Sequence, residues 1–280
     1  MRIHHLNCGT CCPAGGALMD GSSVGPLARL VCHCLLLETN DGLVLVDTGY
    51  GLKDVRDPHP RLTRTYRAIL NFRLREEECA IRQVEALGYK ASDVRHIVVS
   101  HLDFDHAGGL EDFPQARVHV MAQEFSAASG PRLGFTTRNR YRPRQWDEVT
   151  NWRTYDGPSG EPWFGFEAVR QLDGLPPEIL MVPLPGHTWG HAGVAIDTGD
   201  KGWLFYAADA YFYQGEVRGK TREVTPLLAG YQDLMEVDRA KRLANQARVR
   251  ALSVDHWSEV RVFCAHDATE FDRAREGRPL

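Results

Sequence analysis

The chain has 280 residues, 43% of them hydrophobic, which is enough to bury a large core, and we expect one domain over residues 1–280. Its formal net charge of −4 shows no basic excess, so we expect no nucleic-acid partner, because such partners are bound mainly by neutralising phosphates. No signal-peptide core follows Met1 and no apolar run has the length of a membrane span, so we expect a cytoplasmic protein that does not contact membranes.

Three strands are predicted at the start of the chain. Residues 2–7, 30–38 and 43–47 are rich in apolar and β-branched side chains, and glycine-containing turns separate them. The turn Asn40-Asp41-Gly42, between the last two runs, is typical of a hairpin. The sequence therefore predicts that the first sheet begins with antiparallel strands.

Asp47 ends the third predicted strand and is followed by Thr48 and Gly49. A polar turn at this place can put its carboxylate close to a functional site, where it would support a metal ligand through a hydrogen bond. An equally good interpretation is a turn-capping aspartate that bonds only to the local backbone. The sequence leaves both interpretations open.

The chain has seven cysteines, an odd number that excludes a fully paired disulfide framework, so reduced thiols are expected. Cys8, Cys11 and Cys12 lie close together, and Cys32 and Cys34 follow them. A structural zinc site normally has two Cys-x-x-Cys pairs or additional histidines. We therefore interpret these cysteines as small buried thiols near the first strands.

The middle of the chain alternates between helical and strand patterns. Residues 76–87 have apolar side chains at helical spacing, whereas residues 96–100 are a β-branched run typical of a buried strand. Residues 116–121 predict another strand, and residues 122–128 predict a short helix. A helix, two strands and a second helix are therefore expected between residues 76 and 128.

The densest group of possible metal ligands follows the strand at residues 96–100. In the segment Ser100-His-Leu-Asp-Phe-Asp-His-Ala-Gly-Gly109, four donors lie within six residues: His101, Asp103, Asp105 and His106. Imidazole and carboxylate together suit zinc and the harder transition metals. Because a strand anchors the loop, several side chains can be aimed at one point, and the sequence predicts a metal site here.

Residues 132–162 have poor periodicity and are rich in arginine and aromatic residues. We interpret this segment as an insertion over the site, either a lid or substrate wall or a surface excursion without a role in binding. Its aromatic residues and those just beyond suit an apolar wall or ordinary core packing: Trp146, Trp152, Tyr155, Trp163 and Phe164. Its alternating arginines favour a solvated face over the attraction of an anionic substrate: Arg138, Arg140, Arg142 and Arg144.

Strand patterns return in the last third of the chain, at residues 179–184, 192–197, 203–207 and 261–265, and residues 237–252 predict an amphipathic helix. Three of these strands are followed by a polar candidate: His187, Asp209 and His266. His191 is either a partner of His187 or, as we favour, a residue without a role.

The strands group in both halves of the chain, each half with helices, which predicts two sheets packed face to face with helices outside. Polar residues at the ends of successive strands converge on one edge of such a fold. A site at that edge avoids burying unpaired charge in the core. We therefore expect the donors from both halves to meet at one rim.

The His-x-Asp-x-Asp-His segment, followed in order by His187, Asp209 and His266, resembles the motif of the metallo-β-lactamase-fold superfamily of hydrolases. The resemblance covers about residues 30–266 and implies an αββα sandwich of two mixed β-sheets that binds two divalent metal ions. It implies one ion held by His101, Asp103 and His187, another held by Asp105, His106 and His266, and a bridge made by Asp209. Asp103 stands where the family's commonest motif has a second histidine. Its anionic oxygen makes the site harder, so zinc is expected, with manganese or iron as alternatives.

The resemblance implies a hydrolase in which a metal-bridging hydroxide attacks a carbonyl, with Asp105 or Asp209 orienting the nucleophile or moving its proton. The wording of the motif is most similar to N-acyl-homoserine lactonases, which implies a small-molecule lactone, ester or thioester as the substrate. That group has a tyrosine three residues after the bridging aspartate. Phe212 occupies this position here, so Tyr211 and Tyr213 are candidate substrate contacts or packing aromatics. An iron-dependent oxidoreductase and a non-catalytic metal-binding protein remain alternatives, and the oligomeric state stays open.

Overall fold

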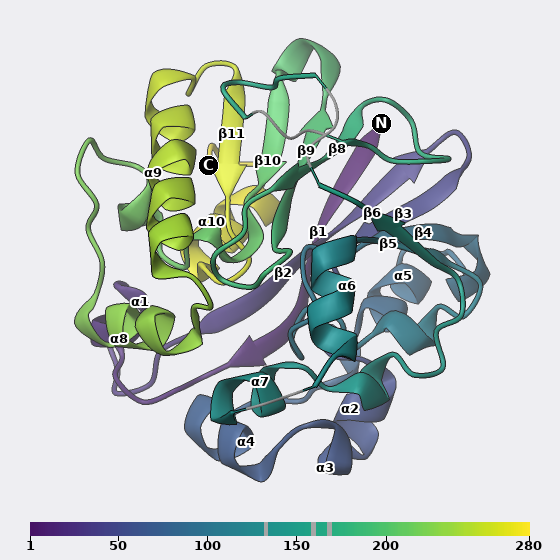
Figure 1. Cartoon of the computed structure of the whole chain (residues 1–280), viewed down its shortest axis with the longest axis horizontal. Coiled ribbons are helices and arrows are strands. Elements are labelled where there is room, and N and C mark those ends of the chain that lie inside the picture. The colour runs from purple at the N-terminus through teal and green to yellow at the C-terminus, as the bar shows by residue number, and fades with distance from the viewer. Residues whose placement is uncertain (132–133, 158–160, 167–169) are drawn as a thin grey trace.

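The computed structural model describes residues 1–131, 134–157, 161–166 and 170–280. Two mixed sheets lie face to face, with helices on their outer sides (Figure 1). The predicted αββα sandwich is confirmed. Among the described residues, no helix combines the length and the apolar character needed to cross a bilayer.

The first sheet has six strands in sequence order, and its first two pairings are antiparallel while the other three are parallel. The strands are β1 (Arg2–Cys11), β2 (Leu30–Thr39), β3 (Gly42–Val46), β4 (Val94–Val98), β5 (Arg117–Met121) and β6 (Trp152–Tyr155). The predicted hairpin between β2 and β3 is confirmed. β1 is longer than predicted, because it continues past an irregularity between Asn7 and Thr10.

Within the described residues, the second sheet has five strands, with β11 and β10 parallel and the other neighbours antiparallel. The strands are β7 (Arg170–Gln171), β8 (Ile179–Pro183), β9 (Ala192–Asp197), β10 (Trp203–Tyr206) and β11 (Val260–Phe263). Four of them match the runs predicted from the sequence. The ends of β8, β10 and β11 each lead to one of the predicted donors.

Side chains from both sheets make the central core. Leu35 and Val44 from the first sheet belong to the same buried cluster as Met181, Val194 and Phe263 from the second. Burying such a side chain contributes about 1.5–3 kcal/mol. This shared core fixes the two sheets against each other, and therefore fixes the loops at their common rim.

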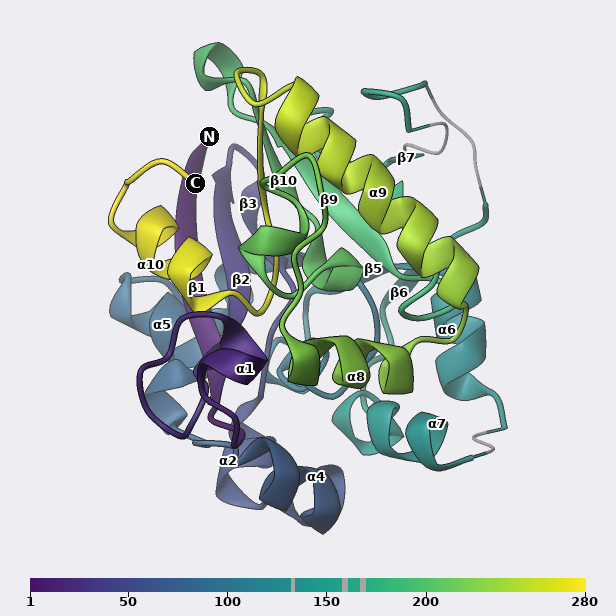
Figure 2. The ribbon, with the colours of Figure 1, turned by 90° about the vertical axis from the view of Figure 1, so that its left-hand side faces the viewer.

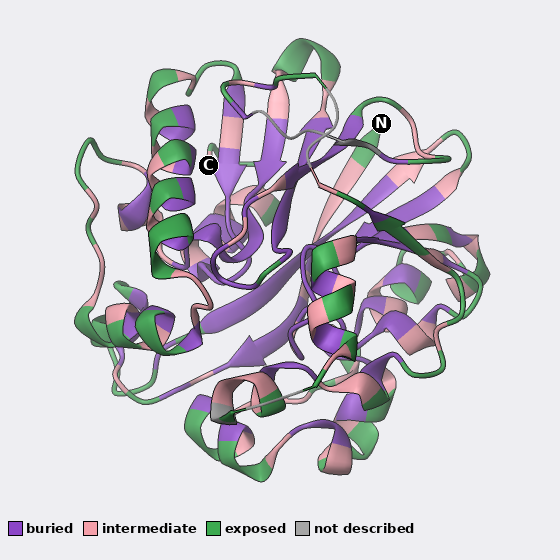
Figure 3. Ribbon diagram, in the orientation of Figure 1, coloured by how far each residue is buried: buried purple, intermediate pink, exposed green. Residues whose placement is uncertain are grey.

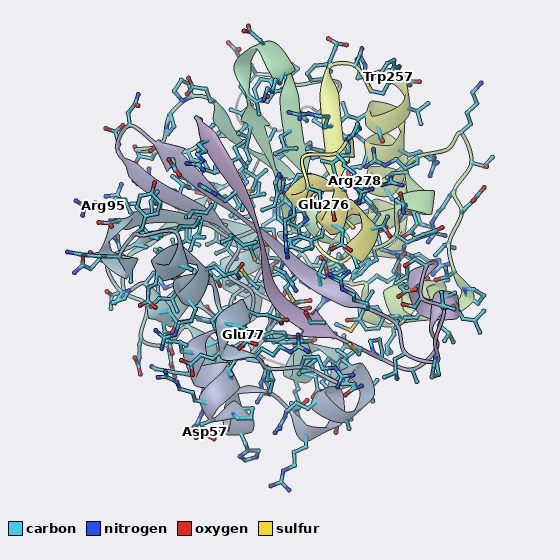
Figure 4. All side chains as sticks on the ribbon, turned by 180° about the vertical axis from the view of Figure 1, so that it is seen from behind. Asp57, Glu77, Arg95, Trp257, Glu276 and Arg278 are labelled. Atoms are coloured by element: carbon cyan, nitrogen blue, oxygen red, sulfur yellow. The ribbon has the colours of Figure 1, made fainter. Side chains whose placement is uncertain are left out.

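The helices lie around the two sheets. They are α1 (Ala17–Asp20), α2 (Leu52–Arg56), α3 (Pro58–Arg61), α4 (Arg64–Leu70), α5 (Ala80–Ala86), α6 (Ala122–Ser129), α7 (Phe135–Arg140), α8 (Pro226–Met235), α9 (Arg239–Asp255) and α10 (Ala268–Arg275). α5 and α6 pack on the first sheet and α9 on the second (Figure 2). α9 has a buried and an exposed side along its length (Figure 3), as its amphipathic pattern predicts. Charged residues such as Asp57 and Arg95 are exposed at the surface (Figure 4).

The structure differs from the predicted elements in the helical regions. The predicted helix at 76–87 is a 3₁₀ turn (Glu76–Glu78) followed by α5. α8 was not predicted, although Thr225 before Pro226 is a helix-start signal. The segment interpreted as an insertion contains α7, and its β6 pairs with β5 as the edge of the first sheet. Residues 132–133 and 158–160 of that segment lie outside the described residues.

Candidate metal centre

The structure brings together all seven donors predicted as metal ligands. Four lie in the loop after β4, one in the loop between β8 and β9, one after β10 and one after β11. Six of the side chains are buried and Asp105 is partly exposed. The loops come from both sheets, so the shared rim predicted from the sequence is where the donors meet.

The first group of donors contains His101, Asp103 and His187, whose ligand atoms all lie within 4.8 Å of one another. Nε2 of His187 is 3.1 Å from Oδ2 of Asp103, and Nε2 of His101 is 3.6 Å from the same oxygen. Two imidazoles therefore face one carboxylate oxygen, which is a suitable arrangement for a divalent cation.

The second group contains Asp105, His106 and His266. The Nε2 atoms of the two histidines are 3.4 Å apart. Oδ1 of Asp105 is 4.0 Å from Nε2 of His106, and Oδ2 is 3.8 Å from Nε2 of His266. Two imidazoles and one carboxylate again point to one place.

Asp209 lies between the two groups and offers one oxygen to each. Its Oδ1 is 3.1 Å from Nε2 of His266 and 3.3 Å from Nε2 of His106. Its Oδ2 is 3.3 Å from Nε2 of His187 and 3.7 Å from Nε2 of His101. The carboxylate is thus in the position of a bridge.

Hydrogen bonds on the far side of two rings set their protonation. Nδ1 of His266 lies 2.8 Å from the carbonyl oxygen of Val31, which can only accept, so Nδ1 carries the proton and Nε2 presents a lone pair. Nδ1 of His106 is 2.7 Å from Oδ2 of Asp47 and donates in the same way. Both rings are therefore held in the tautomer that a metal ligand requires.

Asp47 supports the centre rather than capping its own turn. Its Oδ1 accepts a hydrogen bond from the backbone N–H of Ser100 at 2.7 Å, and the Ser100 hydroxyl and Tyr206 hydroxyl each donate to Oδ2 at 2.7 Å. Burial raises the pKa of Asp47, but the charges of His106 and His101 and the hydrogen bonds from His106 and Ser100 together lower it overall. Of the two interpretations left open by the sequence, the contacts favour support of His106, which is predicted to be a metal ligand.

The charges of the cluster shift its pKa values strongly. Burial opposes the charged form of His266, yet the Asp209 carboxylate outweighs it and raises the pKa of His266 to about 9. Burial also raises the pKa of Asp209, but the charges of His266 and His106 hold it well below its usual range. His266 therefore attracts a proton that a cation would displace on binding, whereas burial lowers the pKa of His187 to about 4.

The donor set fits two divalent cations. Nε2 of His101 is buried and makes no hydrogen bond within the described part of the chain, although it points at two carboxylates. A buried nitrogen without a partner is costly unless a ligand satisfies it. With three carboxylates around four imidazoles, the cluster offers each of two cations a mixed nitrogen and oxygen environment.

Arg140 is a part of the site that sequence reasoning missed. Its side chain is 1% exposed, so the prediction of a solvated arginine face is wrong at this position. Its Nε is 3.0 Å from Oδ1 of Asp103, and its guanidinium also donates to the backbone oxygen of His187 at 2.8 Å. The alternating arginines gave no signal of this, because the contact joins α7 to the loop after β4.

Two further buried residues tie the loops together. His191 donates from Nδ1 to the carbonyl of Leu184 at 2.9 Å and accepts the backbone N–H of Asp209 at Nε2, also at 2.9 Å. It therefore positions Asp209, contrary to the interpretation we favoured. The Glu124 carboxylate accepts the backbone N–H groups of Leu102 and Gly190, each at 3.0 Å, and so joins two of the donor loops.

All seven cysteines are free, and six of them are buried, as expected. One of them nevertheless lies at the centre: the thiol of Cys32 is within 4.8 Å of ligand atoms of Asp105 and His266. The contact with Cys11, together with burial, raises the pKa of Cys32 well above its usual value. The thiol is therefore neutral in this structure.

The two candidate tyrosines, Tyr211 and Tyr213, differ in burial and in their contacts. The Tyr211 hydroxyl is buried and donates to the Glu270 carboxylate, with distances of 3.1 and 2.9 Å to its two oxygens. Tyr213 is partly exposed and packs beside Met19 and Phe212. The hydroxyl of Tyr211 is thus already engaged away from the donor cluster.

Phe212 packs against the donors, and Tyr231 packs against Phe212. The Phe212 ring stacks on that of His266 with centroids 5.0 Å apart, and Tyr231 of α8 meets Phe212 edge-on at 5.9 Å. Burial and the charges of Asp105 and Asp209 raise the pKa of Tyr231 well above its usual value. Sequence reasoning missed Tyr231 because it did not predict α8.

Most aromatic residues of the segment before β7 serve the core. Trp146 packs in the cluster outside the first sheet, Tyr155 packs between the sheets, and Trp163 packs against Phe205 outside the second sheet. For these three residues, the core-packing interpretation is the one that the structure shows.

The comparisons with known proteins identify the family to which this double sheet with donors at the shared rim belongs. The chain belongs to the metallo-beta-lactamase superfamily, whose family model matches residues 27–244. It is 41% identical over 277 residues to a probable metallo-hydrolase of Mycobacterium tuberculosis, covering 99% of this chain and 83% of the relative. The protein is thus a metal-dependent hydrolase.

Two more distant similarities concern lactonases. The chain is 27% identical over 241 residues to an N-acyl homoserine lactonase of Bacillus cereus, covering 82% of this chain and 84% of the relative. It also matches the structure of an N-acyl homoserine lactone hydrolase with the product N-hexanoyl-L-homoserine bound at its catalytic metal centre. That match has a TM-score of 0.70 and 21% identity, and it covers 96% of this chain and 94% of the other. At this level of identity it shows the shared fold.

Proposed function

We propose that this hydrolase uses a dinuclear metal centre to open a small carbonyl ester, with a lactone as the favoured substrate. The observation that carries the proposal is the position of Asp209, whose two oxygens each face the Nε2 atoms of a different pair of histidines at 3.1–3.7 Å. The similarity to lactonases supports the choice of a lactone.

Under this proposal, His101, Asp103 and His187 hold one ion, and Asp105, His106 and His266 hold the other. Two bound cations would supply an activated water near neutral pH and polarise the substrate carbonyl. Asp209 spans both groups and sets their separation, while Asp105, which is partly exposed, is placed to accept or return a proton. We propose zinc as the metal, with manganese or iron as alternatives because Asp103 supplies oxygen.

The substrate would lie against Phe212 and Tyr231. Phe212 offers an apolar face beside His266, and the phenol of Tyr231 stays protonated next to the carboxylates. A protonated phenol can donate a hydrogen bond to the carbonyl or to the leaving oxygen. Tyr231 is therefore our candidate for the substrate contact, ahead of Tyr211 and Tyr213.

The test compares the wild type with Asp209→Ala and with Asp200→Ala, a matched change at an exposed aspartate. Metal content is measured by elemental analysis, and turnover is measured on a panel of lactones, esters, thioesters and β-lactams. We expect two metal ions per wild-type chain, lactones as the best substrates, and loss of activity by at least 10³-fold in Asp209→Ala with reduced metal content.

Asp200→Ala should match the wild type in both measurements. Full activity in metal-free wild-type protein, or in Asp209→Ala, would overturn the proposed mechanism. Turnover of esters or thioesters without lactones would keep the metal centre and overturn the choice of substrate. A coloured iron protein would overturn the choice of zinc.

A further inference from the structure

Arg140 is a buried cation placed directly against a predicted metal site. Its Nε lies 3.0 Å from Oδ1 of Asp103, and both side chains are almost fully buried. A second nitrogen donates to the backbone oxygen of His187 at 2.8 Å, and a third lies 3.1 Å from Nε2 of that histidine. The guanidinium therefore touches two of the three donors in the first group.

The Asp103 carboxylate divides its two oxygens between different partners. Oδ1 faces Arg140, whereas Oδ2 faces Nε2 of His187 and of His101. This arrangement leaves only Oδ2 available to a cation in the first group. The contact at Oδ1 is an ion pair without hydrogen-bond alignment, since neither Oδ1 nor Nε has a hydrogen-bond partner within the described residues.

The net charge of the centre gives a reason for a buried arginine beside Asp103. The centre contains three carboxylates, those of Asp103, Asp105 and Asp209, which carry a charge of −3 when all are ionised. With the Arg140 cation the sum is −2, the same as for a centre with a neutral donor in place of Asp103 and no arginine. Burying the arginine would be unfavourable without the carboxylate, since an unpaired buried charge costs several kcal/mol.

We propose that Arg140 is the charge partner and positioning residue of Asp103, so that the two together replace a neutral metal donor. This inference rests on the proposed metal centre and adds the residue that balances its charge. It assigns to α7 a direct influence on the first metal ion. It also explains why an aspartate can stand at position 103, the one position at which the motif departs from the family's commonest form.

The proposal predicts that the effect of Arg140 depends on residue 103, which a double-mutant cycle measures. The proteins are wild type, Asp103→His, Arg140→Met and the double variant Asp103→His/Arg140→Met. Histidine keeps a donor at position 103 while removing its charge. Each protein is stripped of metal, and its affinity for Zn²⁺ and Co²⁺ is measured by competition with a chromophoric chelator, so no catalytic turnover is needed.

Asp103→His should lower the affinity for the first ion at least tenfold, because it leaves the Arg140 cation unpaired beside that ion. Adding Arg140→Met to Asp103→His should raise the affinity for the first ion again by at least tenfold. In the wild-type background, Arg140→Met should give no gain in affinity, because Asp103 loses the cation that pairs with its Oδ1. The visible spectrum of the Co²⁺ form should change with Arg140→Met, because the coordination of Asp103 changes with it.

Arg138→Met, at an exposed arginine of the same helix, is the matched control and should leave affinity and spectrum as in the wild type. Arg140→Lys keeps a cation, so its metal affinity and Co²⁺ spectrum should be nearer to those of the wild type than the values of Arg140→Met are. If Arg140→Met does not fold, Arg140→Lys takes its place in the comparison. Equal effects of Arg140→Met in both backgrounds would overturn the inference while leaving the metal centre in place. A wild-type protein that binds no metal would overturn both.

Discussion

At the scale of single residues, the imidazoles of the candidate centre are oriented by what lies behind them. The Val31 carbonyl holds His266, the Asp47 carboxylate holds His106, and the backbone N–H of Asp209 is held by His191. Such supporting contacts commonly change metal affinity by 10–100-fold when they are removed. The chemistry of the centre therefore depends on more residues than the seven donors.

Tyr231→Phe tests the proposed substrate contact. We expect kcat/KM on the best lactone of the panel to fall about tenfold, equivalent to about 1.4 kcal/mol, because one hydrogen bond to the transition state is lost. Metal content should not change. The kinetic constants and elemental analysis of the purified variant check both statements.

Tyr213→Phe and Tyr211→Phe are the comparisons. Tyr213→Phe should leave turnover unchanged, whereas Tyr211→Phe should lower the free energy of unfolding, since the buried Glu270 carboxylate loses a donor. A loss of turnover in Tyr213→Phe equal to that in Tyr231→Phe would contradict our choice of Tyr231.

At the scale of elements, the start of α6 holds two donor loops in place. Glu124 accepts the N–H groups of Leu102 and Gly190, and the chain at Gly190 passes so close that a Cβ there would lie 2.2 Å from the Glu124 backbone nitrogen. Only glycine allows this approach. The spacing between the loop after β4 and the loop before β9 is set by this contact.

Gly190→Ala should therefore push α6 away from the loop that carries His187. We expect the free energy of unfolding to fall by about 1–3 kcal/mol, as for other overpacked sites, and metal affinity to fall with it. Chemical denaturation and chelator competition measure the two effects. Gly230→Ala is the matched control, because a Cβ at Gly230 of α8 meets no atom within 4 Å. It should raise stability by about 0.5–1 kcal/mol through helix propensity, and a destabilisation equal to that of Gly190→Ala would contradict the argument.

The strands and their terminal donors were predictable because both signals are local. A β-branched run such as Val94–Val98 followed by polar residues indicates a strand that ends at a site. Arg140 and Tyr231 were not predictable, because their importance comes from contacts with Asp103 and Phe212, which are distant in sequence. α7 has a polar composition that is typical of an exposed helix, and only its pairing with the donor loop explains why its last arginine is buried.

At the scale of the whole molecule, buried charges join segments that are distant in sequence: α2 and α3 on one side and residues 111–112 on the other. Arg61 of α3 pairs with Asp54 at 2.7 Å and with Glu111 at 2.9 Å, and the Asp112 carboxylate accepts the backbone N–H of Leu52 at 2.9 Å. Burial raises the pKa of Asp112 to about 6, and the nearby Asp54 adds to that rise. This carboxylate is thus ionised at neutral pH in an unfavourable environment.

Because the pKa of Asp112 is higher in the folded state than its ordinary value of 3.8, the folded state binds more protons between about pH 4 and pH 6. The contribution of Asp112 to stability must then fall as the pH rises through that window. Asp112→Asn should remove this loss and raise the free energy of unfolding at pH 7 by about 1–2 kcal/mol. At pH 3.5 the variant and the wild type should be equal.

Urea denaturation of both proteins at pH 3.5 and pH 7 measures the difference. Asp200→Asn, at an exposed position, should give the same stability as the wild type at both pH values. A difference for Asp112→Asn that is larger at pH 3.5 than at pH 7 would reverse the predicted sign and contradict the argument.

The division of the donors between the sheets also has a consequence for biosynthesis. The loop after β4 leaves the ribosome early, when its four donors still lack His187, Asp209 and His266, and His266 follows the last strand, β11. A nascent chain therefore cannot assemble either complete set of ligands until the second sheet has formed, since Asp209 follows β10 and belongs to both. Under the proposed metal centre, the second ion can find its full set of ligands only after β11 and His266 have been synthesised.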